Sequence, residues 1–310
     1  QHDPMRRRTL LKSASLLAPA APLAALAQGA LPARRIPASG DSIPVIGLGT
    51  WITFNVGQDP PERARCVQVM KAFFEGGGRV IDSSPMYGSS QGVVGEGLAR
   101  LGATGQVFSA EKVWTSGDGA AQIEATRRLW GVPRFDLMQV HNLLAIDRQL
   151  PLLMEMKARG EVRHVGITTS EGRRHAEIAQ LLRTRRLDFV QLSYNPVDRE
   201  AESVLLPLAA ERGVAVLVNR PFQEGALVRR LQRHPLPAWA AETGAASWAQ
   251  LVLQFILAHP AVTCVIPATG NVAHVRENLA AARLPALTKE PASPKRQMRC
   301  VPLGTAQVVV

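Results

Sequence analysis

The chain has 310 residues, of which 46% are hydrophobic and 20% charged, so it can bury a large core and is not mainly disordered. Its formal net charge of +11 would suit a polyanionic partner, but the basic residues are scattered as short pairs within helical patterns, without aromatic interleaving. We therefore expect no nucleic-acid partner. The cysteines show no metal-ligand or CxxC spacing, which argues against a disulfide framework and a zinc site, and we expect Cys66 and Cys264 to be buried apolar residues.

The first 27 residues have the pattern of an export signal. Residues 1–4 precede the start residue Met5 and are set aside as upstream read-through or a cloning remnant. Residues 6–12 resemble the twin-arginine signal, and the apolar stretch 13–27 ends in an A-x-A cleavage pattern. We predict a mature periplasmic chain that begins at Gln28, with the export machinery as a partner. The apolar stretch is short and interrupted by prolines, so no stable membrane anchor is expected after cleavage; a general secretory signal or a disordered arm are the alternatives.

From residue 45 onward, short β-branched apolar runs alternate with longer amphipathic stretches. Eight such units predict an α/β protein with a closed, parallel, eight-stranded (β/α)8 TIM barrel over residues 28–287, followed by a basic C-terminal tail at 288–310. An open doubly wound sheet is the rival, but Gly47-Leu48-Gly49-Thr50-Trp51 lacks the third glycine and the following helix of a dinucleotide fingerprint. The predicted strands are 45–50, 79–83, 107–113, 135–141, 163–168, 188–193, 214–219 and 262–267, and the clearest helices are 62–75, 120–130, 172–185 and 247–258.

Polar side chains stand at the ends of three successive predicted strands. Asp82 ends the second strand, Lys112 the third and His141 the fourth, while Tyr87 follows Asp82 in the next turn. Neighbouring strands are about 4.8 Å apart, so these ends can converge on one pocket at the carboxyl face of a barrel. Each residue alone also fits an ordinary structural role, such as a turn cap, an exposed strand end or a packed ring. The four together favour a catalytic site.

The four side chains match the chemistry of carbonyl reduction. A phenol titrates near 10, and we expect the Lys112 ammonium to lower the pKa of Tyr87. Asp82 would keep Lys112 charged, and His141 would donate a hydrogen bond to a substrate carbonyl. We therefore predict general acid catalysis with Tyr87 as the proton donor and a small carbonyl compound as the substrate. A metal-dependent hydrolase is disfavoured, and no metal ligands are predicted, because the strand ends carry one histidine and no carboxylate cluster.

The same segments resemble the aldo-keto reductases across residues 40–285. The resemblance implies that Asp82, Tyr87, Lys112 and His141 form a catalytic tetrad, and that NADPH, or less often NADH, lies extended over the carboxyl face of the barrel. The matched segments are Gly47-Leu48-Gly49-Thr50-Trp51, Ile81-Asp82-Ser83-Ser84-Pro85-Met86-Tyr87-Gly88, Glu111-Lys112-Val113-Trp114, Asp136-Leu137-Met138-Gln139-Val140-His141-Asn142 and Ile266-Pro267-Ala268-Thr269.

The resemblance also assigns residues to the cofactor. At the nicotinamide end, the pair at 168–169 is two threonines where the family commonly has serine and asparagine, and Asn219 stands where many members place a stacking ring. Phe222 is expected to take part of that role, and Arg220 with the backbone around Gly225 is expected to contact the pyrophosphate. The residues assigned to this end and to the pyrophosphate are Thr50, Trp51, Thr168, Thr169, Gln191, Asn219, Arg220, Phe222 and Gly225.

The adenosine end departs from the family pattern. Ala268 and His274 replace its basic residues for the 2′-phosphate, whereas Glu277 and Asn278 match its adenine-contacting positions; Thr269 completes the predicted set. A phosphate dianion is normally met by Arg or Lys, and the loss of these residues weakens the case for NADP(H) over NAD(H). The expected cofactor is NADP(H) on the habit of the family alone, with NAD(H) as the alternative. A low-turnover sensor or accessory protein that binds the nicotinamide nucleotide on the same barrel is the alternative function.

Overall fold

The computed structural model describes residues 30–285, 287, 301–303 and 306–308, so the predicted export signal and most of the tail lie outside the described residues. Eight parallel strands occur in sequence order within one sheet, each hydrogen-bonded to the next. Their β-branched, fully buried sequences are typical of parallel strands covered on both faces. They are β3 (Leu48–Gly49), β4 (Val80–Asp82), β5 (Phe108–Val113), β6 (Phe135–Val140), β7 (Val162–Thr168), β8 (Phe189–Ser193), β9 (Ala215–Asn219) and β10 (Val262–Val265).

The first and last of these strands meet, which closes the barrel. Parallel bridges pair Ile46 with Val265 and Gly49 with Ala268, and the N–H of Gly47 donates to the carbonyl of Val265 at 2.8 Å. A Cβ atom on Gly49 would lie 2.7 Å from the carbonyl oxygen of Ile266, so a side chain at this position would force the two strands apart. The predicted (β/α)8 barrel is thereby confirmed.

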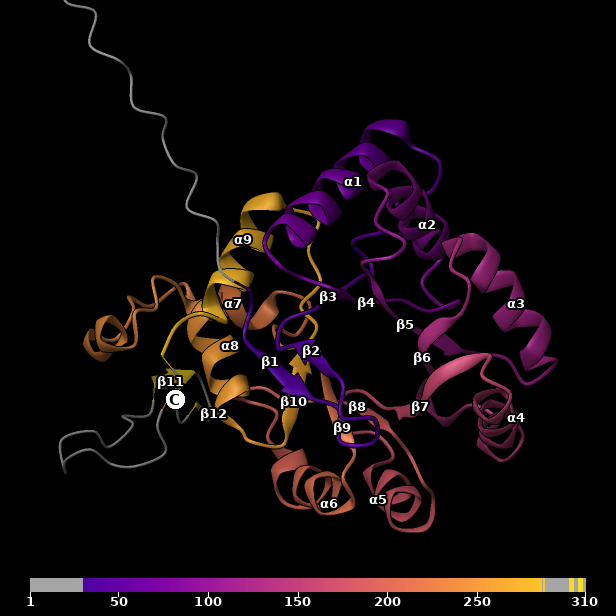
Figure 1. Cartoon of the computed structure of the whole chain (residues 1–310). Helices are drawn as coiled ribbons and strands as arrows, with labels where there is room; N and C mark the ends of the chain where they lie inside the picture. Colours follow the sequence, from indigo (N-terminus) through magenta and orange to yellow (C-terminus); the bar gives the residue numbers. More distant parts are fainter. Residues whose placement is uncertain (1–29, 286, 288–300, 304–305, 309–310) are drawn as a thin grey trace, which may run out of the picture.

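Helices surround the strands on their outer side (Figure 1). Several begin at a polar cap residue; for example, Asp118 accepts a hydrogen bond from the N–H of Ala121 at 3.0 Å. The helices are α1 (Pro60–Glu75), α2 (Ser90–Leu101), α3 (Gly119–Trp130), α4 (Ile146–Ala158), α5 (His175–Thr184), α6 (Leu205–Arg212), α7 (Ala226–Leu231), α8 (Trp248–Ala258) and α9 (Val272–Ala281), with short 3-10 turns η1 (His141–Leu143), η2 (Glu200–Glu202) and η3 (Ala238–Thr243).

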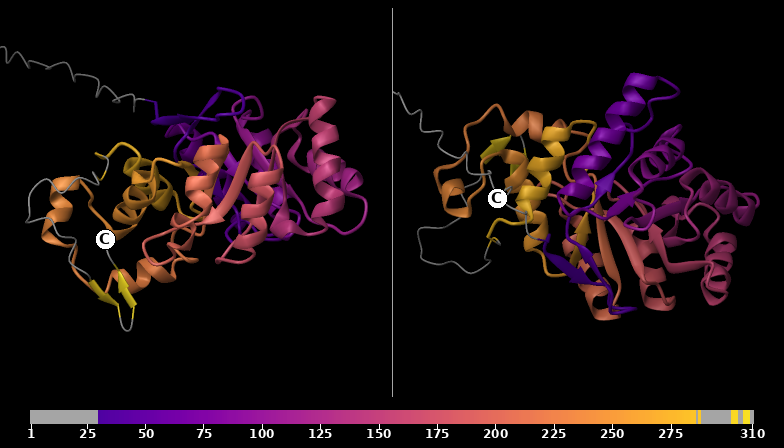
Figure 2. Two further views of the ribbon diagram at one scale, coloured as in Figure 1. Left: turned by 90° about the horizontal axis from the view of Figure 1, so that it is seen from below. Right: turned by 45° about the horizontal axis from the view of Figure 1, so that its top comes forward.

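A hairpin that the sequence analysis did not predict closes the amino-terminal end of the barrel (Figure 2). It pairs β1 (Ala33–Arg35) with β2 (Ser42–Pro44). Ile36 and Ile43, which are 0% and 2% exposed, belong to the hydrophobic cluster that fills the barrel interior. The hairpin therefore plugs the bottom of the barrel, and its strands are too short to show a periodic pattern in the sequence.

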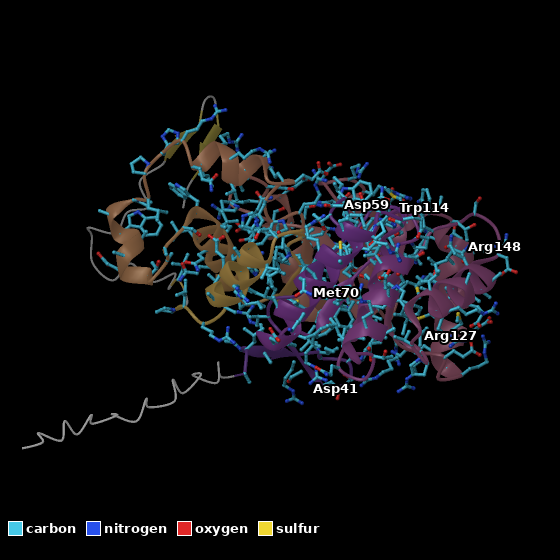
Figure 3. The ribbon with its side chains drawn as sticks, turned by 90° about the horizontal axis from the view of Figure 1, so that it is seen from above. Asp41, Asp59, Met70, Trp114, Arg127 and Arg148 are labelled. Carbon is cyan, nitrogen blue, oxygen red and sulfur yellow. The ribbon has the colours of Figure 1, made fainter. Side chains whose placement is uncertain are left out.

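The opposite end of the barrel is open and carries the loops that follow the strands. In Figure 3, Asp59 and Trp114, which follow β3 and β5, lie on one side of the molecule, and Asp41 of the hairpin turn lies on the other. The long connection between β9 and α8 contains α7 and η3. A second small hairpin pairs β11 (Val301–Leu303) with β12 (Ala306–Val308). Within the described part of the chain, no helix has the length and apolar character needed to cross a membrane.

Candidate active site

A buried ion pair joins two of the predicted catalytic residues across neighbouring strands. Nζ of Lys112, on β5, lies 2.5 Å from Oδ1 of Asp82, on β4, and also donates to the carbonyl of Ser83 at 2.8 Å. The two side chains are 0% and 3% exposed. A lysine can be charged at such depth only with close anionic and carbonyl partners, so Asp82 holds Lys112 in the position that was predicted.

The ring of Tyr87 lies directly beside this ion pair. Nζ of Lys112 is 5.0 Å from the centre of the ring, and Trp51 packs against the same ring with centroids 4.9 Å apart. Burial raises the pKa of the Tyr87 phenol, and the Lys112 charge opposes this effect without overcoming it. The predicted net lowering of that pKa is therefore wrong for this structure, because the site is drier than the sequence could indicate. The Tyr87 phenol is therefore protonated and can act as a proton donor.

His141 completes the group, and a neighbouring serine forms a hydrogen bond with its ring. Oγ of Ser84 lies 2.7 Å from Nδ1 of His141 and accepts the N–H of Met86 at 3.2 Å. The direction of the Ser84–His141 bond depends on the histidine tautomer; donation from the serine to Nδ1 corresponds to the tautomer with its proton on Nε2. Burial, reinforced by the charges of Lys112 and Arg173, lowers the pKa of His141 to about 2, so the imidazole is neutral at any working pH. Ser84 was part of a matched segment, but its role was not predicted.

Behind the tetrad, an amide network fixes the inner wall of the site. Nε2 of Gln191 donates to Oδ2 of Asp82 at 2.9 Å, and Nε2 of Gln139 donates to the same oxygen at 3.3 Å. Asn219 donates to the carbonyl of Thr169 at 2.9 Å and accepts from the hydroxyl of Ser193 at 2.7 Å. Asn219 is therefore part of a hydrogen-bond network at the position where the family commonly has an aromatic ring.

A cavity of about 800 Å³ opens above these residues at the mouth of the barrel. Tyr87, His141 and Asp82 line one end of it, while Lys112 lies buried beneath. The cavity also reaches α9, where His274 and Asn278 line the wall. Its volume and its polar lining groups fit a dinucleotide.

The predicted cofactor residues line this cavity, with one exception. Thr169 does not, because its hydroxyl donates to the backbone carbonyl of Arg173 and so stabilises a turn. Those that line the cavity are Thr50, Trp51, Thr168, Gln191, Asn219, Arg220, Phe222, Gly225, Thr269, His274, Glu277 and Asn278.

Arg220, the predicted pyrophosphate contact, is held by two carboxylates. Its guanidinium lies 2.9 Å from Oε1 of Glu171 and 2.6 Å from Oε1 of Glu224. Glu224 also accepts a hydrogen bond at 3.3 Å from the indole N–H of Trp51, in the loop that follows β3. These contacts connect three loops across the opening. Neither glutamate was predicted, since a charged residue in a loop is usually a solvated one.

A further buried carboxyl lies behind the tetrad on the outer side of the barrel wall. Glu111 accepts hydrogen bonds from Gln91 on α2 at 3.0 Å, from the indole of Trp130 on α3 at 2.8 Å and from the backbone N–H of Lys112 at 2.8 Å. Burial raises the pKa of Glu111 to about 7. The two cysteines predicted to be buried are buried and free, and no group of three or more metal-ligating side chains occurs among the described residues.

The fold and the site together define a class, the (β/α)8-barrel oxidoreductases with a Tyr, Lys, Asp and His centre. The sequence profile of the aldo/keto reductase family matches residues 45–294, and the chain belongs to this family. It is thus an NAD(P)H-dependent oxidoreductase.

Individual relatives agree with this placement. Methylglyoxal reductase YeaE of Escherichia coli is 30% identical over 252 residues, covering 78% of this chain and 87% of the relative. An aldo/keto reductase from Klebsiella pneumoniae, solved in complex with NADP and acetate, has a TM-score of 0.69 at 25% identity and covers 81% of this chain and 89% of its own. The holo form of an aldo-keto reductase from Bacillus halodurans shares the fold, with a TM-score of 0.68 at 24% identity and coverage of 83% and 93%.

Proposed function

We propose that the chain reduces aldehydes or ketones to alcohols with NADP(H), or with NAD(H) as the alternative cofactor, and that Tyr87 is the general acid. The observation that carries the proposal is the position of the Tyr87 ring, which lies 5.0 Å from the Lys112 ammonium and lines a cavity of about 800 Å³. The complex of the Klebsiella relative with NADP supports the choice of cofactor.

The cofactor would lie along the cavity wall. Arg220 and the backbone at Gly225 would hold its pyrophosphate, and Glu277 with Asn278 would contact its adenine. Gly225 has a φ of +82°, a conformation that glycine adopts without strain, and it precedes the first turn of α7. When bound, the reduced nicotinamide supplies the hydride that the carbonyl carbon receives.

The residues of the chain orient the carbonyl and move one proton. Nε2–H of His141 donates a hydrogen bond to the carbonyl oxygen, which turns the carbonyl carbon toward the hydride donor. The Tyr87 hydroxyl then gives its proton to the same oxygen as negative charge develops there. Lys112 stabilises the phenolate that this leaves, and Asp82 keeps the ammonium in place. The phenolate regains a proton from solvent before the next turnover.

A direct test compares the parent with Tyr87→Phe. Loss of the absorbance of NADPH or NADH is followed with an aldehyde such as methylglyoxal. The parent should turn over, and the variant should lose at least about 100-fold in kcat while binding the cofactor with similar affinity. A variant as active as the parent would remove Tyr87 from its role. A parent that binds the cofactor and shows no turnover would favour the sensor or accessory function, which the occupied Arg220 and the altered position of Asn219 also support.

The proposal includes export to the periplasm through the signal at residues 1–27. Its support is the run Arg7-Arg8-Thr9-Leu10-Leu11-Lys12 followed by an apolar stretch with an A-x-A end. The test is cell fractionation of the full chain and of a variant with Arg7→Lys and Arg8→Lys. Periplasmic parent protein that lacks the signal, with cytoplasmic retention of the variant, is the expected result. An equal distribution of the two would contradict a twin-arginine route.

A further inference from the structure

An arginine that no predicted role includes lies at the catalytic end of the cavity. Arg173 belongs to the loop between β7 and α5 and lines the same cavity as Tyr87 and His141. Its charge is close enough to His141 to contribute to the lowered pKa of that imidazole. The arginine is therefore a cation at the substrate end of the site, distinct from Arg220 on the loop after β9.

The backbone of this loop holds Arg173 in a defined position. The N–H of Arg173 donates to the carbonyl of Ser170 at 3.1 Å, and the carbonyl of Arg173 accepts a hydrogen bond from the hydroxyl of Thr169. The backbone N–H of Glu171 donates to Oγ of Ser193 at 3.0 Å. Glu171 has a φ of +57°, a strained conformation for a residue with a side chain. A loop held by this many contacts presents its side chain with little loss of conformational entropy when a ligand binds.

Part of the guanidinium is unused by the protein. Nη2 of Arg173 bonds Oγ of Ser170 at 2.7 Å and Oε2 of Glu171 at 3.1 Å, and Nε bonds the carbonyl of Ser170 at 3.2 Å. Among the described residues, Nη1 has no hydrogen-bond partner. The same holds for the side-chain amide of Asn142, which also lines the cavity and whose described bonds use only its backbone. Two sets of free donors thus stand beside His141.

We propose that Arg173, together with Asn142, binds an anionic group on the substrate, so that the enzyme prefers carbonyl compounds that carry a carboxylate. This inference rests on the proposed carbonyl reduction and adds the class of substrate. Asn142 has a φ of +50°, in the left-handed region that asparagine tolerates better than most residues, and it directly follows His141. When the carboxylate of such a substrate is bound there, the reducible carbonyl group of the same molecule would lie next to Nε2 of His141. A guanidinium and a primary amide are both donors suited to a carboxylate.

The test uses substrate pairs that differ only in charge. Pyruvate is compared with methyl pyruvate, and 4-carboxybenzaldehyde with its methyl ester, so that both a short and a long spacing are sampled. For at least one pair, the parent should have a kcat/KM about tenfold or more higher for the acid. In Arg173→Gln this acid-to-ester ratio should fall to about one, and in Arg173→Lys part of it should return, because the ammonium is still a cation. Higher salt should reduce the ratio of the parent, since the Arg173 side chain is 59% exposed.

A matched control removes the same charge elsewhere. Arg183→Gln lies on α5, exposed and away from the cavity, and should keep the parent's ratio. A parent without acid preference in either pair, or an unchanged ratio in Arg173→Gln, would overturn the inference. A variant that loses affinity for NADPH but keeps the ratio would show that Arg173 holds a cofactor phosphate instead, which also overturns it.

Failure of the proposed function has a different signature. If the parent reduces no member of either pair, the subsite is judged by binding, with indole fluorescence used to measure the affinity for 4-carboxybenzaldehyde and for its ester. If the parent binds the acid more tightly than the ester and Arg173→Gln loses this difference in affinity, the anion subsite is supported even without catalysis. Equal affinities in the parent would reject it.

Discussion

Nζ of Lys112 and Oδ1 of Asp82 lie 2.5 Å apart, in a pair of side chains that are 0% and 3% exposed. Replacing Lys112 by methionine leaves the Asp82 carboxylate buried without its cation, and we expect a loss of about 3–5 kcal/mol in the free energy of unfolding. Adding Asp82→Asn should recover most of that stability but none of the activity, with kcat at least about 100-fold below that of the parent in both variants. Urea unfolding and steady-state rates measure the two effects. A double variant with restored kcat would show that Lys112 is only structural.

Oγ of Ser84 lies 2.7 Å from Nδ1 of His141, and the proposed mechanism requires the His141 proton on Nε2, so Ser84→Ala should weaken the orientation of the substrate carbonyl. We expect kcat/KM to fall about five- to tenfold, the value of one hydrogen bond, without a comparable loss of stability. Ser83→Ala is the matched control, because that buried hydroxyl pairs with Ser90 at 2.9 Å and does not reach the histidine. Equal losses in the two variants would argue that Ser84 matters only for packing.

The buried carboxyl of Glu111 predicts a dependence of stability on pH. Its pKa is about 7 in the folded chain and near 4.5 when exposed, so the folded state binds the proton more tightly. The contribution to stability is complete below about pH 4.5, declines as the pH rises to about 7, and is constant above, with a slope of at most about 1.4 kcal/mol per pH unit. Urea unfolding of the parent and of Glu111→Gln from pH 4.5 to 8 measures it. The stability of the parent relative to Glu111→Gln should fall as the pH rises through this window; parallel curves would place the Glu111 titration elsewhere.

Glu224 pairs with Arg220 and accepts from Trp51, so it would compete with a pyrophosphate bound at Arg220, as proposed above, for the guanidinium. Glu224→Gln should bind NADPH about three- to tenfold more tightly, since one negative charge leaves the cavity and Arg220 loses one of its two carboxylate partners. Quenching of indole fluorescence measures the affinity. Glu177→Gln is the control, because Glu177 pairs with Arg174 on the outer side of the loop. Weaker binding in Glu224→Gln would mean that the glutamate organises the loop for the cofactor.

Much of the barrel could be predicted because most of the parallel strands are short, largely apolar runs that are buried on both faces. Asp82, Lys112 and His141 could be predicted as site residues because they are polar side chains at the carboxyl ends of predicted strands, where barrel enzymes place their catalytic groups. The hairpin that carries Ile36 and Ile43 was missed because three-residue strands have no readable period.

The sequence did not allow us to predict which loop residues line the cavity or the net pKa shift of Tyr87. Arg173, Glu171 and Glu224 lie in loops, where charged residues are common, and only the backbone conformation directs them into the cavity. The net pKa shift of Tyr87 depends on two opposing effects: burial of the ring, which raises the pKa, and the nearby charge of Lys112, which lowers it. That balance is a property of the packed site, and no pattern of residue types reports it.

Because Ile36 and Ile43 seal the bottom of the barrel, everything that enters or leaves must use the single mouth. With a dinucleotide bound along the cavity wall, as proposed, the carbonyl compound would have to enter through the same opening. The nucleotide would then bind first and leave last, and the alcohol would leave while the oxidised nucleotide is still bound. This order would couple the rate of each catalytic cycle to the loops that Glu171, Arg220 and Glu224 connect.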